Sequence, residues 1–170
     1  LVRRVKDRAG NRAAVVAGVG SNDTRHAVDM ARRAAAAGAD ALLLVTPYYS
    51  RPAQAGVIAR SRAVADTTDL PVMLYDIPAR TGVRLELDTL RALARHPRIV
   101  ALKDCGGRPE CTEALVAEGK LQVLCGTDPE WFASRCLGGA GAVAASAHVR
   151  TDRPHRLQHP RRPPRLQRRP

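Results

Sequence analysis

The strongest constraint on the fold is a series of six short apolar segments spaced along the chain. Each has four or five residues and is almost continuously apolar, as expected for strands buried on both faces of a parallel sheet. Longer amphipathic stretches separate them. The segments are residues Ala13–Ala17, Ala41–Val45, Pro71–Tyr75, Ile99–Leu102, Leu121–Leu124 and Gly141–Ala145. Strands that alternate with helices predict an α/β protein.

The stretches between these segments carry helix signals. Asn22, Asp23 and Thr24 offer N-caps for an alanine-rich helix that Gly38 ends. The first residues resemble the middle of another helix. Further helices are predicted over residues 53–67, 87–95, 109–118 and 129–137.

Two architectures fit this alternation: a doubly wound open sheet and a (β/α)₈ barrel. A barrel needs about 250 residues and eight βα units, and this sequence of 170 residues shows six. The chain is therefore either a smaller open sheet or a barrel that lacks a piece. Residues 1–149 are predicted to form this one α/β domain.

The pattern ends at Val149. Residues 150–170 contain eight arginines, one aspartate and five prolines, and they carry +7 of the net charge of +12. Prolines prevent a helix here. One interpretation is a basic tail for RNA or a membrane surface; the other is a disordered or frame-shifted end, since GC-rich codons in the wrong frame encode mainly Arg, Pro, Ala and Gly. Because the charge is in a tail and not spread over one face, nucleic acid is not an expected partner.

Several classes of protein are not indicated. No run of 18 apolar residues exists, so no membrane span is expected, and the first residues lack a signal core. The four cysteines form no CxxC pair, which favours reduced thiols in the cytoplasm. The histidines show no ligand spacing, so no metal is expected. The segment Gly18–Gly20 fails the dinucleotide fingerprint because position 23 is Asp.

Polar residues follow the apolar segments, where the carboxyl ends of parallel strands gather reactive groups. These residues are Thr46–Tyr49, Tyr75-Asp76, Lys103-Asp104 and Gly126–Asp128. We expect an amine, a hydroxyl and several carboxylates to share one mouth.

Lys103 is the leading candidate for covalent chemistry, being one of only three lysines. An apolar strand end disfavours the charged amine and frees it to attack a ketone; an ion pair with Asp104 is the alternative. Tyr49 and Tyr75 can relay protons or simply pack at the rim. Arg80, in a tight loop after Tyr75, suits a substrate carboxylate or a surface salt bridge.

Together these residues resemble the dihydrodipicolinate synthase / N-acetylneuraminate lyase family over about residues 15–149. The order and spacing of the shared motifs carry the resemblance. They are Ala17–Gly20, Val45–Pro52, Leu74–Gly82, Ala101–Asp104, Gly126–Asp128 and Gly138–Gly141.

The resemblance implies a metal-free class I enzyme in which Lys103 forms an imine with pyruvate and Tyr75 moves protons beside it. Tyr49 would act across a dimer interface, Arg80 would hold the carboxylate of aspartate semialdehyde, and Val143 would offer backbone contacts to pyruvate. No cofactor is implied, because pyruvate is bound covalently as a substrate. A dimer or tetramer is usual in the family.

The Tyr48-Tyr49 pair and the Arg-Thr-Gly after the third strand favour the synthase, with 4-hydroxy-tetrahydrodipicolinate on the route to lysine as product. The alternatives are another pyruvate aldolase acting on a sugar acid and a non-catalytic remnant. Two features depart from the family. Its Gly-Thr-Thr-Gly-Glu turn, which contacts the pyruvate carboxylate, is missing, and six strands of a partial TIM barrel leave two sheet edges open. We therefore expect a fragment of a family member that has little or no activity.

Overall fold

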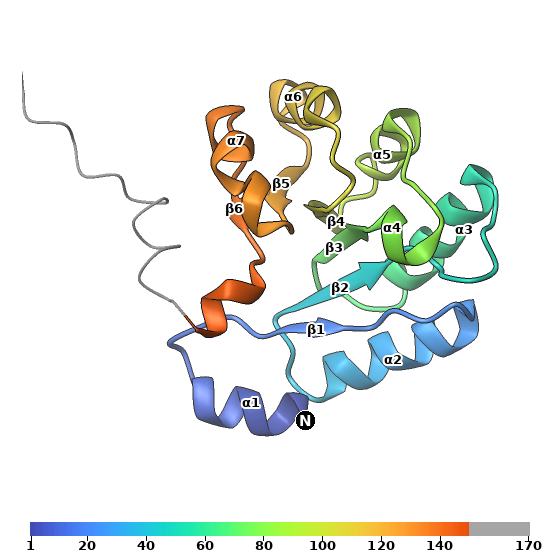
Figure 1. The fold of residues 1–170 in the computed structure, drawn as a ribbon. Coiled ribbons are helices and arrows are strands. Elements are labelled where there is room, and N and C mark those ends of the chain that lie inside the picture. The colour runs from blue at the N-terminus through green and yellow to red at the C-terminus, as the bar shows by residue number, and fades with distance from the viewer. Residues whose placement is uncertain (150–170) are drawn as a thin grey trace, which may run out of the picture.

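The computed structural model describes residues 1–149 as a single sheet with helices packed against it (Figure 1). The strands are β1 (Val16–Gly18), β2 (Ala41–Val45), β3 (Val72–Asp76), β4 (Ile99–Asp104), β5 (Gln122–Cys125) and β6 (Gly141–Ala142). The α-helices are α1 (Val2–Ala9), α2 (Thr24–Ala36), α3 (Gln54–Ala65), α4 (Pro78–Thr81), α5 (Leu87–Leu93), α6 (Pro109–Glu118) and α7 (Trp131–Cys136). Two 3₁₀ turns, η1 (Asp128–Glu130) and η2 (Ala145–His148), complete the described elements.

The order of the strands decides between the two expected architectures. All neighbouring strands are parallel, and their order in the sheet is β1-β2-β3-β4-β5-β6, the same as in the sequence. A doubly wound sheet reverses its strand order at a switch point and covers both faces with helices. Here the order never reverses and the helices follow one side of the curved sheet (Figure 1). The fold is therefore a partial (β/α) barrel, as expected.

The predicted elements agree closely with those observed. β2 and α6 have the predicted bounds, and α2 begins after Asp23, whose carboxylate accepts a hydrogen bond from the His26 N–H at 2.7 Å. Gly38 follows this helix with a φ of 84°. The main shifts are at the outer strands: β1 lies at residues 16–18 instead of 13–17, and β6 is only two residues long.

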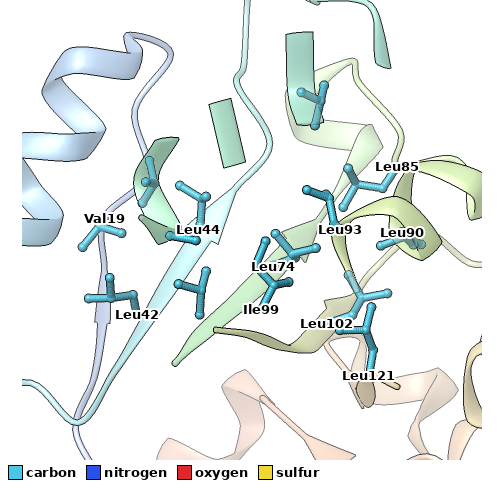
Figure 2. Close-up of a cluster of buried hydrophobic side chains, with 14 of the residues drawn as sticks. Val19, Leu42, Leu44, Leu74, Leu85, Leu90, Leu93, Ile99, Leu102 and Leu121 are labelled. Carbon is cyan, nitrogen blue, oxygen red and sulfur yellow. The ribbon is translucent and has the colours of Figure 1, made fainter. Parts of the chain in front are cut away.

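The core lies between the sheet and its helices. Buried side chains from β2, β3 and β4 pack against apolar residues of α3 and α5. Figure 2 shows this cluster, in which Leu42, Leu74 and Leu102 come from three successive strands and Leu90 and Leu93 come from α5. Burial of these side chains is the main source of stability for the described fold.

The opposite face of the sheet, which we call the inner face, is less covered. Its side chains alternate with those of the core and include Leu43, Val45, Met73 and Leu124, all half-buried, and Val16, which is 44% exposed. The expectation that the strands are buried on both faces is thus wrong for residues 1–149. The reason is that no second wall stands opposite this face in the described part of the barrel.

Residues 150–170, predicted to be a basic disordered or frame-shifted tail, lie outside the described residues. The four cysteines at positions 105, 111, 125 and 136 are free thiols. Among residues 1–149, no helix is both long and apolar enough to cross a membrane.

Candidate active site

Lys103 and Tyr75 lie side by side on neighbouring strands at the carboxyl end of the sheet. The register of β3 and β4 pairs these two residues directly. The Lys103 Nζ stands 4.0 Å from the centroid of the Tyr75 ring, a cation–π contact. Both side chains are half-buried and belong to the inner face. The structure therefore brings together the predicted amine and one of the two predicted phenols.

The alternative expectation for Lys103 was an ion pair with Asp104. Within residues 1–149, no carboxylate lies within salt-bridge distance of Lys103. Successive residues of a strand point to opposite faces, so Asp104 points away from Lys103. The amine thus stays available to a ligand.

Gly126, at the end of β5, sets the path of the Lys103 side chain. A Cβ added at Gly126 would lie 2.8 Å from the Lys103 Cε and 2.3 Å from the Cys105 Sγ. Only a residue without a side chain leaves room for the lysine to pass. The sequence drew attention to the Gly126–Asp128 segment but gave no role to the glycine, because its neighbour is known only once β4 and β5 are paired.

Two of the carboxylates expected at the mouth, those of Asp76 and Asp104, do not lie there in the structure. Asp76 is only 3% exposed and points toward the helices, where its carboxylate accepts a hydrogen bond from the Leu85 N–H at 3.2 Å. The Asp104 carboxylate accepts from the Gly106 N–H at 2.7 Å and from the Thr112 hydroxyl at 3.0 Å. Both carboxylates therefore lie behind the lysine and the tyrosine.

Burial raises the pKa of Asp76 to about 6, and the nearby Asp104 carboxylate adds to the increase. The Leu85 N–H and the guanidinium groups of Arg84 and Arg108 act in the opposite direction. Desolvation is the largest effect because Asp76 has no ion pair in the described part of the chain.

Arg80 lies on the one-turn helix α4, where the sequence predicted a tight loop. Pro78 begins this turn and Gly82, with a φ of 69°, ends it. The Arg80 side chain is exposed and lines a cleft of about 380 Å³ together with Tyr75, Tyr48 and Val45. It also lines an adjoining cleft of about 710 Å³ that contains Tyr49. A guanidinium at this position can meet an anionic ligand next to Tyr75.

Tyr49 lines the larger cleft with Arg80 but is not among the residues that line the cleft of Tyr75. It is 89% exposed and lies in the loop after β2, with a φ of 70° that is unusual for a residue with a side chain. Arg51 in the same loop has a φ of 43°, and its guanidinium packs against Gly82. The two positive φ values mark a strained backbone, and this loop holds the Tyr49 side chain almost fully exposed.

Thr46 and Val143 are the remaining residues that the sequence analysis placed at the site. The buried Thr46 hydroxyl donates to the Thr81 hydroxyl at 3.1 Å, which ties the end of β2 to α4. The Val143 N–H donates to the Cys125 carbonyl at 2.8 Å, so its carbonyl oxygen is the backbone group left for a ligand. No group of three or more His, Cys, Asp or Glu side chains among residues 1–149 is arranged to hold a metal ion.

Comparison with known protein families identifies the family of this chain. The model of the dihydrodipicolinate synthetase family matches residues 1–159. The chain belongs to this family. The match extends over both motif-bearing strands of the site and confirms the resemblance inferred from the sequence.

Individual family members are similar to most of this chain. The 4-hydroxy-tetrahydrodipicolinate synthase of Acidothermus cellulolyticus is 51% identical over 149 residues, which are 88% of this chain and 48% of that protein. The crystal structure of dihydrodipicolinate synthase from Aquifex aeolicus superposes with a TM-score of 0.89 at 32% identity, over 92% of this chain and 55% of that one. The chloride-inhibited dihydrodipicolinate synthase of Acinetobacter baumannii, in complex with pyruvate, gives a TM-score of 0.85 at 38% identity, over 88% of this chain and 52% of that one.

The chain spans about half the length of these relatives. In this chain that half consists of six parallel strands, which include β3 with Tyr75 and β4 with Lys103.

Proposed function

We propose that this chain is the lysine-bearing part of a pyruvate-dependent lyase of the synthase type, which joins pyruvate to aspartate semialdehyde to give 4-hydroxy-tetrahydrodipicolinate. The observation that carries the proposal is the Lys103 amine 4.0 Å from the Tyr75 ring, with no carboxylate pairing that amine in residues 1–149. The names of the relatives support the same reaction.

In this reaction the Lys103 amine attacks the C2 carbonyl of pyruvate and forms a carbinolamine. Loss of water then gives the imine, and the Tyr75 phenol donates and accepts the protons that these steps move. Removal of a proton from C3 of the imine gives an enamine, which attacks the aldehyde carbon of the second substrate while the aldehyde oxygen takes up a proton. The amino group of that substrate then replaces the Lys103 nitrogen at C2, which closes the ring and frees the lysine. Pyruvate enters as a substrate, so this scheme uses no separate cofactor. The pyruvate complex of the Acinetobacter baumannii relative supports pyruvate as the ketone.

The remaining predicted residues have supporting positions in this scheme. Arg80 lines the same cleft as Tyr75 and is proposed to bind the carboxylate of aspartate semialdehyde. The Val143 carbonyl is proposed to face bound pyruvate. Tyr49 is 89% exposed on a strained loop, which supports a role in the site of a second copy and hence a homo-oligomer. The free thiols of the chain suit a reducing cytoplasm.

The test is to incubate the purified chain with pyruvate, reduce with borohydride, and locate the adduct by peptide mass spectrometry. We expect an adduct on Lys103 and none on Lys6, which is paired with Asp40 at 2.5 Å, or on the exposed Lys120. Circular dichroism of the same sample establishes that the chain is folded. A folded chain without an adduct on Lys103 would reject the proposed chemistry.

Matched variants make the result specific. Lys103→Arg keeps the charge but removes the nucleophilic amine, so its adduct should disappear, while Lys120→Arg should behave as the parent chain. Tyr75→Phe keeps the ring that contacts Lys103 and removes only the hydroxyl. It should slow adduct formation by roughly 10²-fold or more, the usual size of a general acid–base contribution.

The second candidate is another pyruvate aldolase of the same family that accepts a sugar acid. It differs only in the aldehyde that occupies the Arg80 cleft. Product analysis with aspartate semialdehyde and with sugar acids as competing acceptors separates the two. Loss of the aspartate semialdehyde product in Arg80→Ala, with the Lys103 adduct kept, would support the synthase.

A further inference from the structure

We propose that Asp76 and Asp104 are positioning residues, whose buried carboxylates hold Tyr75 and Lys103 against each other. The inference rests on the proposed function, because it concerns the same amine and phenol. Asp76 follows Tyr75 on β3, Asp104 follows Lys103 on β4, and the register of the two strands pairs both sets of residues.

The two carboxylates converge on one peptide behind the site. A Cβ added at Gly106 would lie 2.9 Å from the Asp76 Oδ2 and 3.0 Å from the Asp104 Oδ1. Asp104 accepts a hydrogen bond from the Gly106 N–H, and its other oxygen accepts from Thr112 in α6. Gly106 is thus in contact with the last residues of both strands, in a space that no side chain can share.

Hydrogen bonds also join the segment that follows β3, at residues 84–85, to the segment that follows β4, at residues 106–108. The Leu85 N–H donates to Asp76, and the Leu85 carbonyl accepts from the Arg108 guanidinium at 2.8 Å. In the reverse direction, the Arg84 guanidinium donates to the Gly106 carbonyl at 2.6 Å. Each loop therefore donates to and accepts from the other, with the two carboxylates between them.

This network acts on the site because alternate residues of a strand are rigidly linked. Fixing the outward-pointing Asp76 and Asp104 fixes the backbone from which Tyr75 and Lys103 point inward. Removing one carboxylate leaves a buried N–H without an acceptor, which forces the loop to move. A shift of the strand end by about 1 Å is enough to cost much of a reaction rate.

The chemical cost of Asp76 also favours a role beyond stability. Its charge is buried at 3% exposure with no ion pair within residues 1–149, and burial raises its pKa. An apolar side chain would fill the same space under the helices without that cost. What a carboxylate adds is an acceptor for the Leu85 N–H beside Gly106.

The experiment compares Asp76→Ala, which removes the acceptor, with Asp76→Asn, whose amide oxygen can still accept from Leu85. Two readouts are used: the initial rate of pyruvate adduct formation on Lys103, and the ratio of acetylation of Lys103 to Lys120 by limiting acetic anhydride. Asp88→Ala is the control, since Asp88 is a carboxylate on the outer helix α5 with a 93% exposed side chain. Circular dichroism and urea unfolding establish that each variant is folded.

We expect Asp76→Ala to lower the rate of adduct formation by about tenfold or more and to change the acetylation ratio, while Asp76→Asn stays within about twofold of the parent chain. Recovery in the asparagine variant is not expected of a site that needs the negative charge. A folded Asp76→Ala chain with the parent's rate and acetylation ratio would overturn the proposal.

Two further outcomes are covered. If Asp76→Ala does not fold, Thr112→Val replaces it: this nearly isosteric change removes the hydroxyl that Asp104 accepts from, and Thr112→Ser should restore the parent behaviour. An unchanged rate and ratio in folded Thr112→Val would then count against positioning. If the folded parent chain forms no adduct, the proposed function fails. The ratio of Lys103 to Lys120 acetylation in the variants and the parent chain then decides by itself whether these carboxylates position Lys103.

Discussion

Asp76 shows most clearly how one residue's surroundings control its chemistry. Its ordinary pKa is 3.8 and burial raises it to about 6 in the folded chain. The folded chain therefore holds this proton more tightly than the unfolded chain does. Its contribution to stability is most favourable at low pH, is lost as the pH rises from about 4 to about 6, and is constant above that range.

Asp76→Asn should remove this pH dependence, because the amide does not ionise. We expect the free energy of unfolding at pH 7 to increase by roughly 1–3 kcal/mol, with little change near pH 4. Urea unfolding at both pH values measures the effect. Asp88→Asn, on the exposed surface of α5, should leave the difference between the two pH values unchanged. Lower stability of Asp76→Asn at pH 7 would contradict the linkage.

Gly126 is a second residue whose surroundings control the chemistry, because even a Cβ atom at this position would collide with Lys103. An alanine there would place its Cβ 2.3 Å from the Cys105 Sγ and 2.8 Å from the Lys103 Cε, so these side chains must shift. We expect Gly126→Ala to lower the rate of pyruvate adduct formation by about tenfold or more, since catalytic geometry tolerates little displacement. Gly18→Ala is the control, because a Cβ at Gly18 meets nothing within 4 Å. Parent-like adduct formation in Gly126→Ala would show that the lysine reaches pyruvate by another path.

At the scale of the elements, each strand divides its residues between a covered face and an open one. On β3, Leu74 is 2% exposed and packs under the helices, while its neighbour Met73 is half-buried on the inner face. The two residues lie on the same strand and have similar volumes, but they lie on opposite faces of the sheet. Helix packing, rather than hydrophobicity alone, therefore decides how much each contributes to stability.

Truncation of these two side chains should separate the faces. We expect Leu74→Ala to reduce the free energy of unfolding by about 2–5 kcal/mol, the range for a cavity in a packed core. Met73→Ala should cost less than half as much, because its side chain leaves no closed cavity. Urea unfolding of both variants measures the difference. Equal losses would mean that the inner face is covered in solution.

At the scale of the whole molecule, six strands in sequential order make a curved sheet with β1 and β6 at its two edges in the described region (Figure 1). The net charge follows a different division of the chain. Residues 150–170 carry +7 of the total +12, so residues 1–149 carry only +5. Ionic association with polyanions should therefore depend on the last 21 residues and not on the barrel.

Deletion of residues 150–170 tests this division. We expect the melting temperature to be unchanged and retention on immobilised nucleic acid, measured as the salt concentration of elution, to fall sharply. Arg→Ala changes at Arg3 and Arg4 on α1 remove charge from the domain and should alter the elution far less. Equal retention of the shortened and full-length chains would place the basic surface on the barrel.

The sequence by itself predicted the α/β class, the bounds of β2 and α6, the grouping of Lys103 with Tyr75 at one sheet edge, and the place of Arg80 just beyond Tyr75. Local apolar runs, caps and strand-end residues carry this information, since each depends on residues close together in the chain. The assignment of 1–149 as one domain and the roles of the site residues remain predictions.

Only the tertiary structure decided which way each strand-end residue points and what it meets. It turned Asp76 and Asp104 away from the mouth where the sequence grouped them with Lys103. It also brought Gly126 against the lysine and left the inner face without an opposite wall within residues 1–149. The physical reason is that the deciding contacts, Lys103 with Gly126 and Asp76 with Gly106, join residues 23 and 30 positions apart, so strand register and helix packing fix them, and no local pattern records either.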